Sequence, residues 1–196
     1  MKNNNILTGI KKALKLSEND MIEIFKLGGR EVDATELVGM LVVENVELEE
    51  KTIEEIESDE RNIEETDIEE THIEESDIDD QVEEDELIQC DNATLEGFLN
   101  GLIIKKRGIQ DPKPGKPAKP PLAIRNRRSA NNVVFKKMKI AFSLTNEDIV
   151  DLMEEVGITI TKAELTQLFR KEGHSHYKSC TDRYLNGFLD GISQRV

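Results

Sequence analysis

The segment QCDNATLEGFLNGL at residues 89–102 returns as SCTDRYLNGFLDGI at residues 179–192, with six of the fourteen positions identical. In both segments apolar residues recur at positions i, i+3, i+4 and i+7, which is the spacing of a helix with one buried face. These residues are Leu95, Phe98, Leu99 and Leu102 in the first segment, and Leu185, Phe188, Leu189 and Ile192 in the second. The repeat predicts two equivalent helices, each packed into a core.

The similarity extends upstream of these two helices. Residues 3–41 align without gaps with residues 131–169 at an offset of 128 and share nine identities, among them the tandem asparagines at 3–4 and 131–132. The offset between the final helices is only 90, so the first copy holds 38 more residues between its third and last elements. The chain is therefore predicted to be a tandem duplication with an insertion in the first copy.

Each copy is predicted to contain about four helices. Ser17 and Thr145 stand three residues before an aspartate, and Thr161 stands three residues before Glu164, so all three can cap a helix start. Nothing alternates with period two over a useful length, which makes the fold class all-α. The expected organisation is a first helical repeat at 1–107, a Pro/Lys/Arg-rich linker at 108–128 and a second helical repeat at 129–196.

The insertion is strongly acidic and repetitive. Residues 44–86 carry a net charge of −21, the rest of the 196-residue chain carries +6, and the total is −15. Its pentapeptides (NIEET, DIEET, HIEES, DIDDQ) place isoleucine every fifth residue, which forms no stripe on a helix and alternates faces on a strand. One coil of a square β-helix is the alternative, but a solenoid needs neighbours on which to stack. Residues 48–86 are therefore predicted to be disordered.

The prolines define the linker, and the apolar stretches and cysteines indicate the compartment. All five prolines lie within residues 112–121, interleaved with lysines, which predicts an extended linker. No apolar stretch is long enough to span a membrane, and lysines interrupt the apolar pattern of the first residues, so neither membrane nor secretion is expected. Two cysteines do not make a disulfide framework. A cytoplasmic protein is expected.

Three runs resemble the bacterial YehS family, a duplicated helical domain of unknown function (domain of unknown function 1456). They are NNVVFKKMKIA at 131–141, FLNGLI with a following Arg-Gly at 98–108, and H-x-x-Y-x-x-C at 174–180. The resemblance covers about 150 residues and leaves out the acidic insertion and the linker. It implies the fold and a bacterial cytoplasmic compartment, and it implies no catalytic or binding residues.

The candidate binding surface is a group of basic residues that flank the linker, here called the basic collar. It consists of Lys105, Lys106, Arg107, Arg125, Arg127, Arg128, Lys136, Lys137 and Lys139. Such a group can follow phosphates of a nucleic acid or face an acidic protein. Solvated surface charge is the alternative interpretation, and the lack of interleaved aromatic residues gives no support for base stacking.

The cysteines and histidines offer two further chemistries. Cys90 and Cys180 each precede the start of a last helix, where the helix dipole can lower a thiol pKa, but a small buried side chain is the favoured interpretation. His174, His176 and Cys180 offer three metal ligands on a loop, one short of a closed zinc site. No metal, cofactor or catalytic residue is expected.

Two patterns in the helices also need an interpretation. The pairs Gly97/Gly101 and Gly187/Gly191 each put two glycines on one side of a last helix, and we expect the two last helices to pack against each other there. A ligand groove is the alternative. The expected helices at 147–156 and 161–170 resemble a helix-turn-helix, but two helices joined by a short turn are common in any α-bundle.

The sequence contains no nucleotide-binding loop, nucleophile elbow or zincin helix. The favoured hypothesis is a non-enzymatic interaction module that meets an acidic partner or a nucleic acid through the basic collar. A structural or regulatory protein-binding adaptor is the second hypothesis. A thiol-dependent enzyme or redox sensor that uses Cys180 is the third.

Overall fold

The structure, a computed structural model, describes residues 1–42, 87–109 and 122–195, and every regular element in these residues is a helix. The all-α prediction and the predicted duplication are confirmed. The first unit contains α1 (Asn3–Ala13), α2 (Glu18–Leu27), α3 (Ala34–Leu41) and α5 (Asn92–Arg107). The second unit contains α6 (Arg127–Ala141), α7 (Asn146–Glu155), α8 (Lys162–Leu168) and α9 (Asp182–Arg195). The predicted insertion at 48–86 and most of the predicted linker lie outside the described residues.

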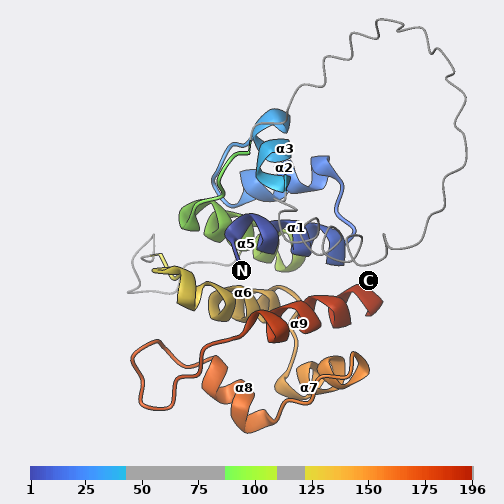
Figure 1. Ribbon diagram of the computed structural model, residues 1–196. Coiled ribbons are helices and arrows are strands. Elements are labelled where there is room, and N and C mark those ends of the chain that lie inside the picture. The colour runs from blue at the N-terminus through green and yellow to red at the C-terminus, as the bar shows by residue number, and fades with distance from the viewer. Residues whose placement is uncertain (43–86, 110–121, 196) are drawn as a thin grey trace, which may run out of the picture.

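The two units meet through their first and last helices. α5 packs against α6 and α1 packs against α9, so each unit gives two helices to the central layer (Figure 1). α2 and α3 cover this layer on one side, and α7 and α8 cover it on the other (Figure 1). Because α1 corresponds to α6 and α5 to α9 in the duplication, the two inter-unit contacts are equivalent and the units are related by a pseudo-twofold axis.

The predicted capping residues start their helices. Ser17 and Asp20 form a reciprocal capping box at α2, and Thr145 and Asp148 form the same box at α7. Thr161 and Glu164 do so at α8. Each box satisfies backbone N–H groups that have no partner inside the helix. These short polar motifs therefore set where the helices of both units begin.

Apolar side chains from both units form one core. All four apolar residues of the repeated stripe in α5 are at most 1% exposed, and those in α9 are at most 3% exposed. Phe98 contacts Phe25 of α2 at a ring-centroid distance of 5.0 Å, and the equivalent Phe188 meets Phe135 of α6 edge-on at 4.2 Å. The repeated stripe thus places equivalent phenylalanines in the core but gives them different partners.

The expected packing of the two last helices against each other through their glycines is wrong. Gly101 lies against the backbone of α2, where a Cβ atom would stand 1.8 Å from the Ile24 carbonyl oxygen. Gly191 lies in the same way against Leu152 of α7, with a Cβ atom 2.8 Å from its carbonyl oxygen. The glycines allow close approach of helices within each unit, rather than between units.

In each unit a buried asparagine of the first helix links the third helix to the residues just before the last helix. Asn4 donates to the carbonyls of Met40 and Ile88 and accepts from the Cys90 N–H at 3.0 Å. Asn132 makes the equivalent three bonds, to Leu168, Lys178 and Cys180. Met40 and Ile88 stand on either side of residues 43–86, so one side chain bonds the described chain before this segment and the described chain after it. This position agrees with the insertion point deduced from the two offsets.

Candidate functional site

The structure divides the basic collar between the two ends of α6. Arg125, Arg127 and Arg128 stand at its start, and the 15 residues of the helix extend about 22 Å from there. Lys105, Lys106 and Arg107 belong to the last turn of α5 and lie near the end of α6, where Arg107 donates to the Ile140 carbonyl. The nine residues therefore do not form one continuous surface.

Most of the collar side chains at the end of α6 have partners inside the protein. Lys105 bonds Asp20 at 2.7 Å and Glu23 at 2.8 Å, and its hydrogen bond is the main reason that the pKa of Asp20 falls to about 2. Lys106 lies over the Phe142 ring, 5.1 Å from its centroid. Lys139 lies over the Phe169 ring and donates to Asn146. These contacts tie helices together.

Lys137 belongs to a buried polar cluster between the units. Its ammonium group bonds Glu96 at 2.9 Å, and the two side chains are only 13% and 8% exposed. Glu96 also accepts the backbone N–H groups of Ala123 and Ile124, at 2.7 and 3.0 Å. Burial lowers the pKa of Lys137, although the hydrogen bond that Lys137 donates to Glu96 opposes the shift. The cluster fastens the chain after the linker onto α5, a role that the charge pattern of the sequence did not reveal.

Six collar residues are exposed: Lys106, Arg107, Arg125, Arg127, Arg128 and Lys136. None of them forms an ion pair with another residue of the described chain. Arg125, Arg127 and Arg128 lie together at the positive end of the α6 dipole, which adds to their attraction for anions. Lys136 stands further along the helix.

A polar cleft lies beside the arginines, where the two units meet. It has a volume of about 770 Å³ and is lined by the start of α1, by Asn92 at the start of α5, by Arg127 and by Asp182. An adjoining hollow of about 460 Å³ shares Met1, Arg127 and Asp182 with it and adds Arg128, Asn131 and Ser179. Helix starts from both units therefore border one region of the surface.

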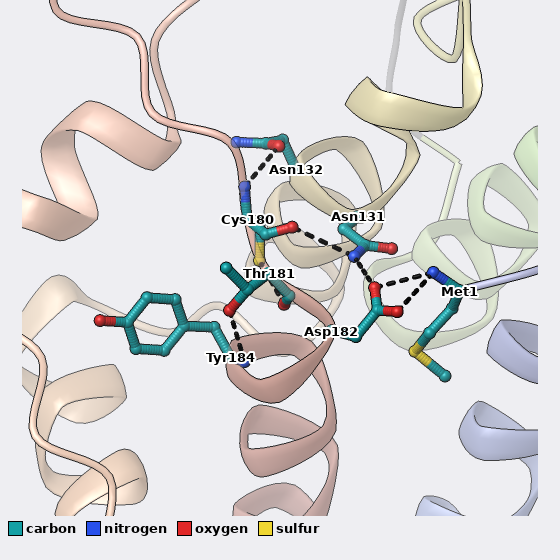
Figure 2. Close-up of polar contacts among 7 residues, drawn as sticks. All are labelled: Met1, Asn131, Asn132, Cys180, Thr181, Asp182 and Tyr184. Atoms are coloured by element: carbon teal, nitrogen blue, oxygen red, sulfur yellow. Dashed lines mark hydrogen bonds and ion pairs between the residues drawn. The ribbon is translucent and has the colours of Figure 1, made fainter.

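Asp182 organises the second unit's side of this cleft (Figure 2). Both of its carboxylate oxygens accept from the Met1 amino group, at 2.7 and 2.8 Å, and one also accepts from Asn131 Nδ2 at 2.7 Å. The bond from the amino group is the main cause that lowers the pKa of Asp182. In the first unit a neutral Asn92 takes the place of Asp182 and accepts from Asn3 Nδ2 at 2.9 Å.

Apart from the two arginines and the two cysteines, sequence reasoning did not select the residues of this cleft and the adjoining hollow. The identity of Asn3 with Asn131 in the repeat was the available signal, because a polar residue repeated at a helix start needs a shared structural cause. Nothing in the pattern indicated that Asp182 of one unit meets Met1 of the other, since that contact depends on how the units pack.

The two thiols are buried, which confirms the favoured interpretation of the cysteines. Both residues are 4% exposed. Burial raises the pKa of the Cys90 thiol to about 12, and the Asp91 carboxylate adds to the shift. Burial also raises the pKa of Cys180 to about 12, with Asp182 contributing. A thiol in this environment is not an activated nucleophile.

We expect both thiols to resist alkylation in the folded protein. With a pKa of about 12, only about one thiol in 10⁵ is ionised at pH 7. Treatment with a maleimide at pH 7 should label neither cysteine within minutes, whereas the same treatment in denaturant should label both. Mass spectrometry of the intact protein measures this directly. Rapid modification of either residue in the native protein would contradict the burial argument.

The possible metal ligands and the helix-turn-helix motif were the remaining candidates from the sequence. His174 and His176 are exposed, whereas Cys180 is buried, and no group of three metal-ligating side chains occurs among residues 1–42, 87–109 and 122–195. In the helix-turn-helix interpretation the would-be recognition helix α8 has only seven residues, and its Lys162 pairs with Glu147 at 2.7 Å. Among the described helices, none has the length and apolar character that a membrane crossing requires.

Comparison with known proteins places the chain in a family. The family model described as "Protein of unknown function (DUF1456)" matches residues 3–108 and 131–196. The chain is 29% identical over 195 residues to the uncharacterized protein YehS of Escherichia coli strain K12, a match that covers 100% of this chain and 96% of that protein. No solved structure matches the chain.

Proposed function

The chain belongs to the DUF1456 family of proteins of unknown function, and we propose that it is a non-enzymatic binding module for a polyanionic partner. The observation that carries the proposal is the cluster of three exposed arginines, Arg125, Arg127 and Arg128, at the start of α6. The guanidinium group is planar and always charged, and it binds phosphate and carboxylate groups through two parallel hydrogen bonds. Lys136 extends the same charge along the helix.

The net charge of −15 does not oppose this function at the arginines. The negative excess resides in residues 44–86, and the rest of the chain is positive by six charges. Charges separated by more than a Debye length of about 8 Å are largely screened at physiological salt. The local field at the start of α6 therefore depends on the nearby arginines more than on the total charge.

The non-enzymatic part of the proposal has its own support. The two thiols that the sequence offered as nucleophiles are buried, and their pKa values are raised to about 12. Free buried cysteines are also compatible with a reducing compartment, and we place the function in the cytoplasm.

Binding to a labelled oligonucleotide tests the proposal. We expect the triple variant Arg125→Gln/Arg127→Gln/Arg128→Gln to bind at least about tenfold more weakly at low salt, because it removes three phosphate contacts. Its plot of log affinity against log salt should also be less steep, by up to about three units. Fluorescence anisotropy at two salt concentrations measures both effects.

The matched control is Lys12→Gln/Lys15→Gln/Lys26→Gln, which removes three exposed charges of the first unit and changes the net charge equally. It should lose less than about threefold in affinity. Deleting residues 48–86, which carry most of the negative charge, should strengthen binding at low salt, where charges are screened less than at physiological salt. Negligible binding by all four proteins would exclude a nucleic acid, and binding to polyglutamate instead would identify an acidic protein as the partner class.

A further inference from the structure

Two isoleucines are exposed to solvent where the ends of α5 and α6 meet. Ile140 is 36% exposed near the end of α6, and Arg107 of α5 donates to its carbonyl oxygen at 3.4 Å. Ile109 is 85% exposed and follows Arg107 by two residues, which is at most about 7 Å along the chain. Only two other large apolar side chains of the described residues are exposed, and they do not belong to these helices.

Three exposed cations accompany the two isoleucines. Lys106 and Arg107 belong to the last turn of α5, and Lys136 stands one turn before Ile140 on the same face of α6. None of the three forms an ion pair within the described part of the chain. The mixed patch is our name for Lys106, Arg107, Ile109, Lys136 and Ile140. Because it combines apolar surface with positive charge, it is complementary to a ligand that combines apolar groups with carboxylates.

The chain itself contains a segment with that chemistry. Residues 61–75 read RNIEETDIEETHIEE, and each of Ile63, Ile68 and Ile73 is followed by two glutamates. No other apolar residue occurs in this segment. Isoleucine side chains gain nothing from contact with water, so their repetition among acidic residues indicates a surface to which they bind.

Residues 61–75 can reach the mixed patch. The residues that connect them to the described chain start beside α1, where Asn4 bonds the chain on either side. The start of α5 lies at the same place, and the 16 residues of α5 extend about 24 Å from there to the patch. The connecting residues 43–60 and 76–86 can span up to about 60 Å and about 36 Å. Length therefore does not prevent the contact.

We propose that the mixed patch binds residues 61–75 of the same chain. The glutamates pair with the three cations, and the isoleucines cover Ile109 and Ile140. Tethering gives the segment an effective concentration on the order of 1 mM, so a contact of millimolar affinity is about half populated. The inference goes beyond the proposed function, because it requires apolar side chains in the ligand and shares only Lys136 with that function.

Tryptophan fluorescence of the full chain tests this contact, since the natural sequence contains no tryptophan. Ile109→Trp places a single probe in the patch, at an exposed position that tolerates substitution. Acrylamide should quench this probe about twofold less than in a chain that also carries Ile63→Ser/Ile68→Ser/Ile73→Ser, because the bound segment shields it. The control probe is Leu122→Trp, which is exposed but outside the patch. Its quenching should not depend on the three isoleucines.

Two pairs of lysine substitutions in the Ile109→Trp chain test the charges. Lys106→Gln/Lys136→Gln should increase the quenching, because it removes two partners of the glutamates. The matched pair Lys12→Gln/Lys15→Gln removes two exposed charges of α1 and should leave the quenching unchanged. The shielding should also decrease in 1 M salt, where the Debye length is about 3 Å.

Four results would overturn the proposal. Equal quenching with and without the three isoleucines would show that they do not bind at the patch, and equal changes at both probes would show that the effect is not local. Shielding that increases with protein concentration would assign the contact to a second copy. Shielding that appears only after addition of anionic lipid vesicles would assign the patch to a membrane surface.

The outcome is separable from that of the proposed function. The triple variant Arg125→Gln/Arg127→Gln/Arg128→Gln changes none of the residues in this contact, so it should keep the shielding of the probe at position 109 while it loses oligonucleotide affinity. Shielding without oligonucleotide binding would uphold the patch and reject the nucleic acid. Oligonucleotide binding without shielding would do the reverse.

Discussion

Replacing Gly101 with alanine is expected to lower the free energy of unfolding by about 3 kcal/mol, because the added methyl group meets backbone atoms of α2. The Cβ atom would lie 1.8 Å from the Ile24 carbonyl oxygen and 2.8 Å from the Gly28 nitrogen. Neither atom belongs to a flexible side chain, so α2 must move away from α5 as a whole. That movement separates Phe25 from Phe98, two rings that are fully buried at the same interface.

The same helix provides a matched control for this substitution. A Cβ atom at Gly97 has no neighbour closer than 3.9 Å, which is ordinary van der Waals contact. Gly97→Ala should therefore keep or raise stability, by up to about 1 kcal/mol, since alanine favours helix more than glycine does. Urea denaturation followed by circular dichroism measures both variants. Similar effects of the two substitutions would show that the close approach at Gly101 does not determine stability.

These glycines also show where sequence reasoning reaches its limit. A pair of glycines four residues apart indicates that another backbone comes close, but it carries no information about which helix that is. The last helix of the other unit, the second helix of the same unit and a ligand would each fit the pattern. The partner is decided by how α2 and α5 pack around Phe25 and Phe98, which is a property of the whole unit.

Short sequence patterns and the comparison of the two copies predicted the structure better than the distribution of charge did. Apolar periodicity, the capping boxes and the two repeat offsets predicted the helices, the duplication and the point of insertion, because each depends on residues close in sequence or on direct comparison of copies. The basic collar, in contrast, was inferred only because its residues lie near the linker in the sequence. The length of α6 separates its members, and burial converts Lys137 into a structural residue.

The repeated asparagines lead to the second prediction. Asn132→Ala is expected to cost about 3 kcal/mol of unfolding free energy, because it breaks a fully connected buried network. Asn132 Nδ2 donates to the Leu168 and Lys178 carbonyls, and Oδ1 accepts from the Cys180 N–H at 2.9 Å and from the Tyr177 hydroxyl at 3.0 Å. Alanine leaves the backbone groups among these without partners.

The control is Asn186→Ala, which replaces an exposed asparagine on α9 of the same unit. Its effect should lie within about 0.5 kcal/mol of zero, as for most surface substitutions. Thermal and urea denaturation of both variants give the comparison. A loss below 1 kcal/mol for Asn132→Ala, roughly the value of one ordinary hydrogen bond, would indicate that the network is not the element that closes the second unit.

The equivalent substitution in the first unit, Asn4→Ala, tests whether the same hydrogen bonds stabilise both copies of the duplication. Asn4 makes three of the four bonds of Asn132, and among the described residues it has no counterpart of the fourth, the bond donated by the Tyr177 hydroxyl. Asn4→Ala should therefore cost slightly less than Asn132→Ala. The insertion lengthens the segment that Asn4 closes by 38 residues, but loop-closure entropy grows only with the logarithm of length. Deleting residues 48–86 should consequently leave the cost of Asn4→Ala nearly unchanged, whereas a strong dependence would mean that the insertion takes part in closing the first unit.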